Sequence, residues 1–445
     1  MTLKQAKEYL EQNDIEFILA QFVDIHGRAK TKAVPANHLP TVIEEGAGFA
    51  GFAVWGLGMG PHGPDFMARG DLDTLCKIGW MPGFARIACD GYVKGKPYEF
   101  DSRITCRRAI EGLKKETGYD AYTGLEPEFF LVKKDPVTGE ISPANDADVL
   151  DKPCYDYDGL NRTAPYIADL TRNLLACGLD VYQIDHEDGN GQYEINFTYT
   201  DALRMADHLI LFKMAATAIA REHGMICSFM PKPMNNRTGS GMHLHISLCK
   251  NGENAFRDDS DANGLGISRL AYQFLGGFFK HAAALTAITC PSVNSYKRLV
   301  VGGSASGATW APAHVCYGDN NRTAMARVCG NHLELRSIDS AANPYLMTAA
   351  VLAAGLDGIR NDLSPGKPHN INLYMTTESQ RAELGIDTLP QNLSEALTAL
   401  EADPVILDGI GRGLAAEFIQ LKKQEWFEYH HHVSDWETKK YLEFY

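Results

Sequence analysis

Two short segments carry pairs of chemically active side chains spaced two residues apart. Glu126 and Glu128 lie in GLEPEFFLV (124–132), and His243 and His245 lie in GSGMHLHISL (239–248). Side chains alternate between the two faces of a β-strand, so each pair would point to one side of its strand. The residues between them are apolar and would form the opposite, packed face. Carboxylates and imidazoles gathered on one face can bind metal ions or transfer protons.

Two further segments repeat this alternation. Glu194 lies in QYEINF (192–197) and Glu334 in HLELRS (332–337), each between apolar residues. In a single strand, such alternation most often marks an ordinary solvated face. Here the polar faces carry Glu and His with almost no Lys, and the pattern recurs in four strands. We therefore expect these four faces to converge on one site.

Converging carboxylates would need cations. Like charges within a few ångströms of one another cannot all stay ionised unless positive charge lies between them. Oxygen ligands suit Mg²⁺ or Mn²⁺, and a histidine among them is compatible with Mn²⁺. Glu187 and Glu194 flank a Gly-Asn-Gly turn in DHEDGNGQYEIN (185–196), which would let both reach one ion. Without the four strands, this segment would be interpreted as an ordinary solvated turn and not as a metal site.

Basic residues gather between positions 295 and 336. They are Arg298 in SYKRLV, Arg322 and Arg327 in NNRTAMARV, and Arg336 beside Glu334. Arginine is the usual bidentate partner of carboxylate and phosphate groups, although any one of these residues could instead form a surface salt bridge. Clustered carboxylates, divalent metals and several arginines suit a highly anionic substrate, such as a nucleoside triphosphate with an organic acid.

Strands and helices alternate along the part of the chain that must position these residues. Periodicity predicts strands over 121–133, 181–199, 241–249 and 331–338, and helices over about 163–177, 201–223, 265–285 and 344–360. The long connections favour a mixed α+β domain with an antiparallel or mixed sheet.

The N-terminal region predicts a separate unit. A helix should begin at a capping box formed by Thr2 and Gln5, and residues 15–35 should form two strands joined at a turn over 24–27. The next helix should begin near Asp101 or Ser102 and end at Gly118. We expect a domain boundary near residue 100, which divides the chain into 1–100 and 101–445.

Composition excludes several classes of protein. The 445 residues are 45% hydrophobic and 22% charged, with a net charge of −14, which argues against nucleic acid or an anionic membrane as the main partner. No apolar run is long enough to span a membrane, and the N-terminus does not resemble a signal peptide. Ten scattered cysteines without a CxxC pair indicate reduced thiols. We expect a cytoplasmic protein.

Several segments, taken in order, resemble the glutamine synthetase superfamily. They are GLEPEFF, HEDGNGQYEINF, FMPKPMNNRTGSGMHLHISL, NSYKRLV, NNRTAMARV, LELRSIDSAANPYL and DWETKKYLEFY, with FVDIHGRAKTKAVP and MPGFARIACD before them. The resemblance covers the whole chain and is greatest to the type III branch, which holds glutamate–ammonia ligases and γ-glutamylmethylamide synthetases. It implies an N-terminal β-grasp domain, a catalytic domain whose curved antiparallel sheet forms a funnel, and a dodecamer with active sites between subunits.

The resemblance also implies roles for individual residues. The first metal would be bound by Glu128, Glu187 and Glu194, and the second by Glu126, His243 and Glu334. The nucleotide would contact His245, Ser247 and Arg327. The amino-acid substrate would contact Gly239, Arg298 and Arg336. Arg322 and Arg327 would neutralise the transferring phosphoryl group, and Asp24 of a neighbouring subunit would bind the incoming ammonium.

The implied activity is an ATP-dependent ligation of the γ-carboxylate of L-glutamate to a small amine through γ-glutamyl phosphate. The chain departs from the family's pattern mainly around the amine. Where bacterial members have PGYEAP, it reads VGGSASGATWAP, with Ser304 in place of the Glu. His332 and Thr238 replace an Arg and an Asn, and the Tyr of the ammonium pocket aligns with Cys154 or Tyr155. These changes favour methylamine as the nucleophile, with ammonia as the alternative.

Two other classes of protein remain open from the residues. A metal-dependent kinase or hydrolase could use the same carboxylates, although the DIHGRAK segment and the extended N-terminal region argue against it. A non-catalytic structural member of the family would be favoured by loss of a metal-ligand Glu, and none is lost. Tyr374, where some bacterial members are adenylylated, is interpreted as an ordinary surface tyrosine.

Overall fold

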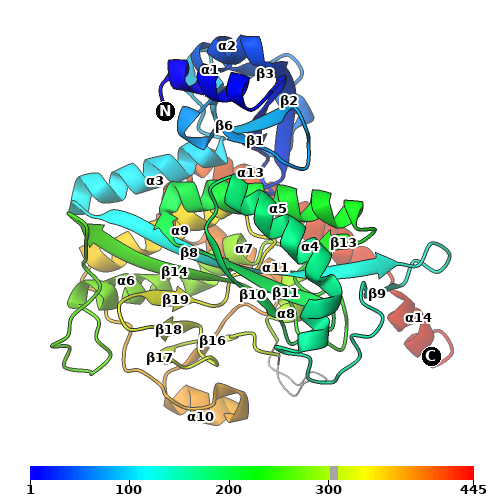
Figure 1. Cartoon of the computed structure of the whole chain (residues 1–445). Coiled ribbons are helices and arrows are strands. Elements are labelled where there is room, and N and C mark those ends of the chain that lie inside the picture. Colours follow the sequence, from blue (N-terminus) through cyan, green and yellow to red (C-terminus); the bar gives the residue numbers. More distant parts are fainter. Residues whose placement is uncertain (301–308) are drawn as a thin grey trace.

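The structure is a computed structural model that describes residues 1–300 and 309–445. Two sheets organise the chain (Figure 1): a smaller one in the N-terminal part, drawn in blue, and a larger one in the main body. Three helices, α3 (Ser102–Thr117), α5 (Ala202–Glu222) and α9 (Pro344–Arg360), lie between the N-terminal part and the large sheet.

The N-terminal part begins with the predicted helix and hairpin. The Thr2 hydroxyl accepts a hydrogen bond from the Gln5 N–H, and this capping box starts the first helix. The first two strands pair antiparallel, and Gly27 closes the turn between them with a positive φ of 76°. The sheet runs in the order β2 (Ala29–Pro35), β1 (Phe17–Val23), β6 (Phe84–Val93), β4 (Phe66–Gly70) and β3 (Ala47–Phe49), with β5 (Cys76–Lys77) and β7 (Lys96–Pro97) also pairing with β6.

The large sheet contains the strands that carry the acidic and imidazole pairs. Neighbouring strands pair antiparallel except β17 with β18, which are parallel, so the expected antiparallel arrangement holds up to that edge. The order is β10 (Val181–His186), β11 (Gln192–Phe197), β8 (Asp120–Lys134), β14 (Met242–Lys250), β19 (Leu333–Leu335), β18 (Ala326–Val328) and β17 (Tyr317–Asp319). Shorter strands flank it: β9 (Ile141–Pro143), β12 (Thr200–Asp201), β13 (Ile226–Ser228) and β15 (Glu253–Asn254), while β16 (His314–Val315) pairs with β20 (Asp387–Thr388).

Helices cover the apolar face of the large sheet. Leu125, Phe129 and Leu244 are almost fully buried in one core with Phe212 of α5. The helices are α1 (Leu3–Gln12), α2 (Leu39–Glu44), α3 (Ser102–Thr117), α4 (Tyr157–Ala176), α5 (Ala202–Glu222), α6 (Arg269–Lys280), α7 (Ala282–Thr289), α8 (Ser295–Arg298), α9 (Pro344–Arg360), α10 (Glu378–Glu383), α11 (Leu393–Glu401), α12 (Pro404–Ile410), α13 (Arg412–His431) and α14 (Asp435–Tyr441).

Three predicted boundaries were wrong, each for a local reason. The strand expected over 181–199 is a hairpin, because Gly191 with its φ of 76° reverses the chain between β10 and β11. The helix expected over 265–285 is interrupted at His281, whose imidazole bonds to Asp357 and Asp403. Helix α4 starts six residues before the predicted 163, since the Asp156 carboxylate accepts a hydrogen bond from the Gly159 N–H and caps it there.

A buried arginine ties the N-terminal sheet to the helices. Arg103, at the start of α3, donates to Asp71 at 2.8 Å, to Asp90 at 2.5 Å and to Asp207 of α5 at 2.8 Å. The Tyr345 hydroxyl donates to the same Asp207 at 2.6 Å. Burial alone would lower the pKa of Arg103, but the surrounding carboxylates raise it well above its ordinary value, so this side chain stays charged.

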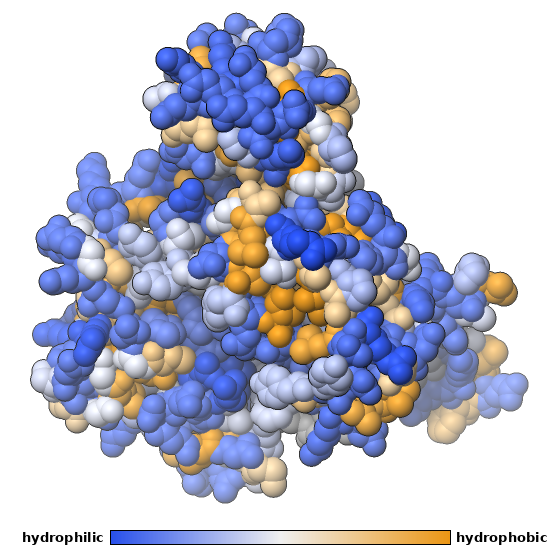
Figure 2. Space-filling view, viewed as in Figure 1, coloured by the Kyte–Doolittle hydropathy of each residue, from blue (hydrophilic) through white to orange (hydrophobic). Residues whose placement is uncertain are grey.

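The surface differs between the two parts of the chain. Figure 2 shows a mostly hydrophilic N-terminal part, and below it hydrophobic residues gather in a band across the centre of this face. Contiguous apolar surface of this kind commonly marks a protein contact. Within residues 1–300 and 309–445, no helix combines the length and apolar composition that crossing a bilayer requires.

Replacing Arg103 tests the junction. Arg103→Met would leave the carboxylates of Asp71, Asp90 and Asp207 facing one another, and we expect a loss of about 3–5 kcal/mol in the free energy of unfolding. Urea denaturation measures this. The matched control is Arg412→Met, whose ion pair with Asp408 is exposed on both sides and should contribute nothing measurable. Equal stability of the two variants would contradict the structural role of Arg103.

Candidate active site

The four strands singled out by the sequence are neighbours in the large sheet. Glu194 of β11 lies opposite Glu128 of β8, and His243 of β14 lies opposite Glu126 of β8. On the other side of β14, His245 lies opposite Glu334 of β19. The polar faces therefore form one continuous surface, and the alternation that each strand shows alone places all their charged side chains on the same side of the sheet.

Two groups of side chains on this surface are close enough to hold a metal ion. One consists of Glu126, His243 and Glu334, and the other of Glu128, Glu194 and His243; within each group the ligand atoms lie within 4.8 Å of one another. His243 belongs to both groups. Each group supplies carboxylate oxygens with one imidazole, which are donors for a hard divalent cation that also accepts nitrogen.

Glu128 is held rigidly in its position. Its carboxylate accepts hydrogen bonds from the Gln192 side chain at 2.6 Å and from the Gly241 N–H at 2.8 Å. A Cβ at Gly241 would lie 2.8 Å from the Arg298 guanidinium and 3.0 Å from the Glu128 carboxylate. Only glycine allows this close approach, so the GSG segment brings Glu128 and Arg298 within reach of one ligand.

Glu334 is fully buried and paired with positive groups. Its carboxylate lies 2.7 Å from Arg336 and 3.4 Å from His243, and it also pairs with Arg327. Burial alone would raise the pKa of Glu334, but His243, Arg336 and Arg327 lower it below its ordinary value. The carboxylate therefore stays ionised without a cation.

The opposite holds for Glu187 and Glu194. Burial, and then the negative charge of Glu128, raises the pKa of Glu187 to about 8. Burial, and then the charges of Glu126 and Glu187, raises the pKa of Glu194 well above its ordinary value. Within the described part of the chain, neither carboxyl has the arginine partners that Glu334 has, and a bound cation would supply the missing positive charge. The donor set and its charge imbalance thus fit divalent metal.

A cavity of about 490 Å³ joins the acidic and the basic residues. Its acidic side includes Glu187 on the turn between β10 and β11, although this residue is outside both ligand groups. The basic and substrate-binding residues expected from the sequence also line it: Gly239, Arg298, Arg322, Arg327 and Arg336. Arg298 is buried and donates to the carbonyl oxygens of Arg336 and Ser337, each at 3.2 Å, which fixes its guanidinium at the cavity wall.

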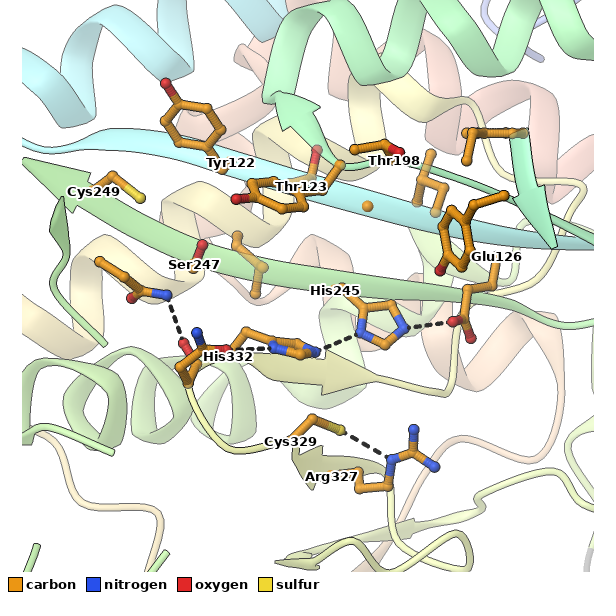
Figure 3. A pocket seen from close by; sticks show the side chains of 18 of the residues that line it. Tyr122, Thr123, Glu126, Thr198, His245, Ser247, Cys249, Arg327, Cys329 and His332 are labelled. Atoms are coloured by element: carbon orange, nitrogen blue, oxygen red, sulfur yellow. Dashed lines mark hydrogen bonds and ion pairs between the residues drawn. The ribbon is translucent and has the colours of Figure 1, made fainter. Parts of the chain in front are cut away.

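A second cavity, of about 580 Å³, shares Glu126, Tyr182 and Arg327 with the first. His245 and Ser247, both expected to contact a nucleotide, line it (Figure 3). Aromatic side chains of Tyr122 and Tyr199 lie on the same wall, with ring centroids 6.2 Å apart. A pocket with aromatic side chains that adjoins the first cavity at Glu126 and Arg327 suits a nucleotide with its phosphates directed toward the first cavity.

His245 lies within a chain of polar contacts in that second cavity. Its Nε2 is 3.1 Å from Glu126 and its Nδ1 is 2.9 Å from the Nε2 of His332. Burial, and then the charge of His245, lowers the pKa of His332 to about 4, so His332 is neutral at pH 7. A neutral imidazole can accept or donate one hydrogen bond at each nitrogen, and His332 thereby orients the ring of His245 (Figure 3).

Of three further residues considered from the sequence, Asp24, Ser304 and Tyr374, only Tyr374 differs from its expectation. Asp24 lines neither cavity: its carboxylate is buried, accepts from the His26 and Arg28 N–H groups, and pairs with Lys30 at 3.0 Å. A role for it in a neighbouring subunit's site stays a prediction. Ser304 lies outside the described residues. Tyr374 is not an ordinary surface residue, since its hydroxyl is buried and burial raises its pKa to about 12.

Sequence reasoning does not single out Gln192 or Trp310. The Gln192 amide bonds to Glu128 and accepts from the Thr238 hydroxyl at 2.8 Å, so it links two sides of the cavity. In the sequence, the signal for a role of Gln192 was its position two residues before Glu194, which places both side chains on the same face of the strand. The Trp310 indole N–H donates to Asp188 at 2.9 Å from within the first cavity. In the sequence, the signal for a role of Trp310 was its place directly after a glycine-rich segment.

Comparisons with known proteins agree with one another. Residues 99–441 match the family model described as glutamine synthetase, catalytic domain. The chain is 54% identical to a glutamate–methylamine ligase of Methyloversatilis universalis, and 39% identical to a glutamine synthetase of Rhizobium leguminosarum bv. phaseoli; both alignments cover 100% of each chain. Among solved structures, a GmaS–ADP complex superposes with a TM-score of 0.91 at 40% identity, covering 98% of this chain and 99% of that one.

The raised pKa of Glu187 gives the metal-free protein a distinctive pH dependence. Between its ordinary value of 4.5 and about 8, the folded chain holds a proton on Glu187 that the unfolded chain releases. The free energy of unfolding should therefore fall as pH rises through this window. Thermal melting in EDTA between pH 5 and 8.5 measures how stability changes with pH. The Glu187→Gln variant should show a flatter dependence than wild type, and the control Glu253→Gln, at an exposed position, should not. An identical slope in wild type and Glu187→Gln would contradict the shifted pKa.

Proposed function

This chain belongs to the glutamine synthetase family, and from that membership we propose that it is an ATP-dependent carbon–nitrogen ligase. Its reaction joins the γ-carboxylate of L-glutamate to a small amine, with methylamine as the preferred nucleophile. The observation that carries the proposal is that a single cavity is lined by four arginines and by every member of the two carboxylate–imidazole groups except the buried Glu334. The adjoining cavity has room for a nucleotide and shares Glu126 and Arg327 with the first.

Divalent cations, Mg²⁺ or Mn²⁺, would occupy the two ligand groups. We propose Glu128, Glu187 and Glu194 for the first ion, and Glu126, His243 and Glu334 for the second. Bound there, such ions would neutralise the carboxylates and the phosphate oxygens of ATP. Since His243 is shared by both groups, a small adjustment of one imidazole would decide which ion it contacts.

The first step transfers the γ-phosphoryl group of ATP to glutamate. A γ-carboxylate oxygen attacks the γ-phosphorus and ADP leaves, which gives γ-glutamyl phosphate. We propose that Arg298 and Arg336, with the backbone at Gly239, hold the glutamate, that Arg322 and Arg327 neutralise the transferring group, and that His245 and Ser247 contact the nucleotide. Phosphoryl transfer depends on positioning and charge neutralisation more than on covalent help from the protein. The buried Arg298 and Arg336 would supply the positioning, and Arg322 and Arg327 at the cavity wall the neutralising charge.

The second step is attack by the amine. An alkylammonium ion has a pKa near that of lysine, about 10, so it arrives as a cation and must lose a proton before it can attack. Carboxylates at the cavity wall would attract the cation and accept that proton. The free amine then attacks the acyl carbon, phosphate leaves, and the γ-glutamylamide forms.

The identity of the amine rests on relatives. The relative at 54% identity is named for methylamine, and those named glutamine synthetase are at 39% identity or less among the curated relatives compared. This difference favours methylamine, while ammonia remains the alternative. A kinase, a hydrolase or a purely structural role has no comparable support.

Assembly and domain organisation are part of the proposal. The family supports a β-grasp domain over residues 1–100, a catalytic domain over 101–445 and a dodecamer with active sites between subunits. The hydrophobic band on the face in Figure 2 is surface that such contacts would bury. Asp24 would reach an active site only if a neighbouring subunit released it from Lys30.

ATP turnover tests the proposed ligase. With ATP and Mg²⁺, ADP release should require glutamate and an amine together. Among methylamine, ethylamine and ammonia at equal concentration, methylamine should give the highest kcat/KM, by about tenfold over ammonia, which is the usual discrimination for one methyl group. ADP release without the joint requirement would indicate a kinase or hydrolase. A higher kcat/KM for ammonia would identify a glutamine synthetase instead.

Replacing Glu334 tests the metal assignment. Glu334→Ala removes a carboxylate of one ligand group and leaves Arg327 and Arg336 without their partner. We expect turnover to fall about 100-fold or more, as it does when preorganised charge at a reacting group is removed. Glu253→Ala, an exposed glutamate of β15, should leave turnover unchanged. Near-normal activity of Glu334→Ala would show that this carboxylate is not required.

A further inference from the structure

Trp310 has an unusual backbone conformation at the edge of the acidic cavity. Its φ is 54°, in the left-handed region that bulky aromatic residues rarely adopt. Backbone strain of this kind persists where surrounding contacts fix it, and such positions concentrate at functional sites. Trp310 lines the wall of this cavity with Glu187 and Asp188.

Two contacts fix the orientation of the indole ring. Its Nε1–H donates to the Asp188 carboxylate at 2.9 Å. Tyr374 meets it edge-on, with ring centroids 6.4 Å apart and planes at 77°. Trp310 nevertheless keeps 44% of its surface exposed, so part of this residue is open to a ligand.

The surroundings of this ring are suited to a small organic cation. Asp185 and Glu187 line the same cavity, and Tyr155 adds a second aromatic side chain. The arginines of the cavity would bind the anionic substrates, so a cationic substrate would be placed among the carboxylates. A carboxylate can bind the N–H groups of an alkylammonium ion, while the face of an indole attracts its alkyl group, which carries part of the positive charge.

We propose that Trp310 is the residue that selects an alkylamine over ammonia, with its indole face in contact with the alkyl group of the incoming ammonium. This inference rests on the proposed ligase activity and adds a specificity-determining residue to it. Ammonium has no alkyl group to pack against the ring, so it lacks that contact, and as the more strongly hydrated ion it loses more hydration on entering. A ring held by Asp188 and Tyr374 is already oriented before the amine arrives, which reduces the entropy lost on binding.

Amine competition in Trp310 variants tests this selection. The kcat/KM values for methylamine, ethylamine and ammonia are compared at saturating ATP, Mg²⁺ and glutamate. In Trp310→Ala, the ratio of methylamine to ammonia should fall about tenfold or more, the range expected for loss of a methyl contact. Trp310→Phe keeps an aromatic face and should retain the ratio within about threefold. Trp436→Ala, an exposed tryptophan of α14, is the matched control and should change nothing.

The outcomes separate this inference from the proposed function. If wild type releases ADP only with glutamate and an amine, the ligase activity stands, and an unchanged methylamine-to-ammonia ratio in Trp310→Ala overturns the role of Trp310 alone. Equal loss with both amines overturns it as well, because Trp310 would then support the cavity without selecting. If Trp310→Ala does not fold, Trp310→Leu decides, since it keeps apolar volume without an aromatic face. The ratio should fall in that variant, and an unchanged ratio refutes the selection.

Discussion

Electrostatic repulsion among carboxylates on one face of the large sheet is the constraint on which the rest of the site depends. Glu126, Glu128, Glu194 and Glu334 come from adjacent strands, and their register places them opposite one another or opposite histidines. Buried like charges raise one another's pKa, and the chain compensates unevenly. Glu334 has two arginines, whereas no arginine among the described residues pairs with Glu187 or Glu194, and burial raises the pKa of both carboxyls, that of Glu187 to about 8. A bound divalent cation would supply Glu187 and Glu194 with the positive charge that Glu334 receives from its arginines.

The remainder of the fold keeps those groups from separating. On the opposite face of the sheet, residues such as Leu125 and Leu244 are fixed in a helix-covered core, so the strands cannot rotate their charged side chains outward. Gly241 lets Glu128 and Arg298 approach closely, and Arg103 ties the N-terminal sheet to α5. Sites of this kind need a rigid scaffold, because ligands held loosely would lose the geometry that charge neutralisation requires.

Much of this architecture could be predicted from sequence, because strand alternation is a local property. The pairs Glu126–Glu128 and His243–His245 predicted which face of each strand is polar. Together with Glu194 and Glu334 they indicated four strands of the same pattern, and these four strands are neighbours in the sheet. Features set by tertiary contacts were not predictable. The interruption of a helix at His281, which contacts Asp403, and the placement of Trp310 against Asp188 depend on residues far apart in sequence.

Anomalous diffraction from crystals soaked in Mn²⁺ would test the central claim most directly. We expect two manganese peaks in each chain, one in contact with Glu126, His243 and Glu334 and the other with Glu128, Glu187 and Glu194. The side chains should keep the positions described for the metal-free chain, with one exception. The Glu334 carboxylate should exchange its ion pairs with Arg327 and Arg336 for the metal ion. A cavity without ordered manganese, with these carboxylates turned away from one another, would contradict the account.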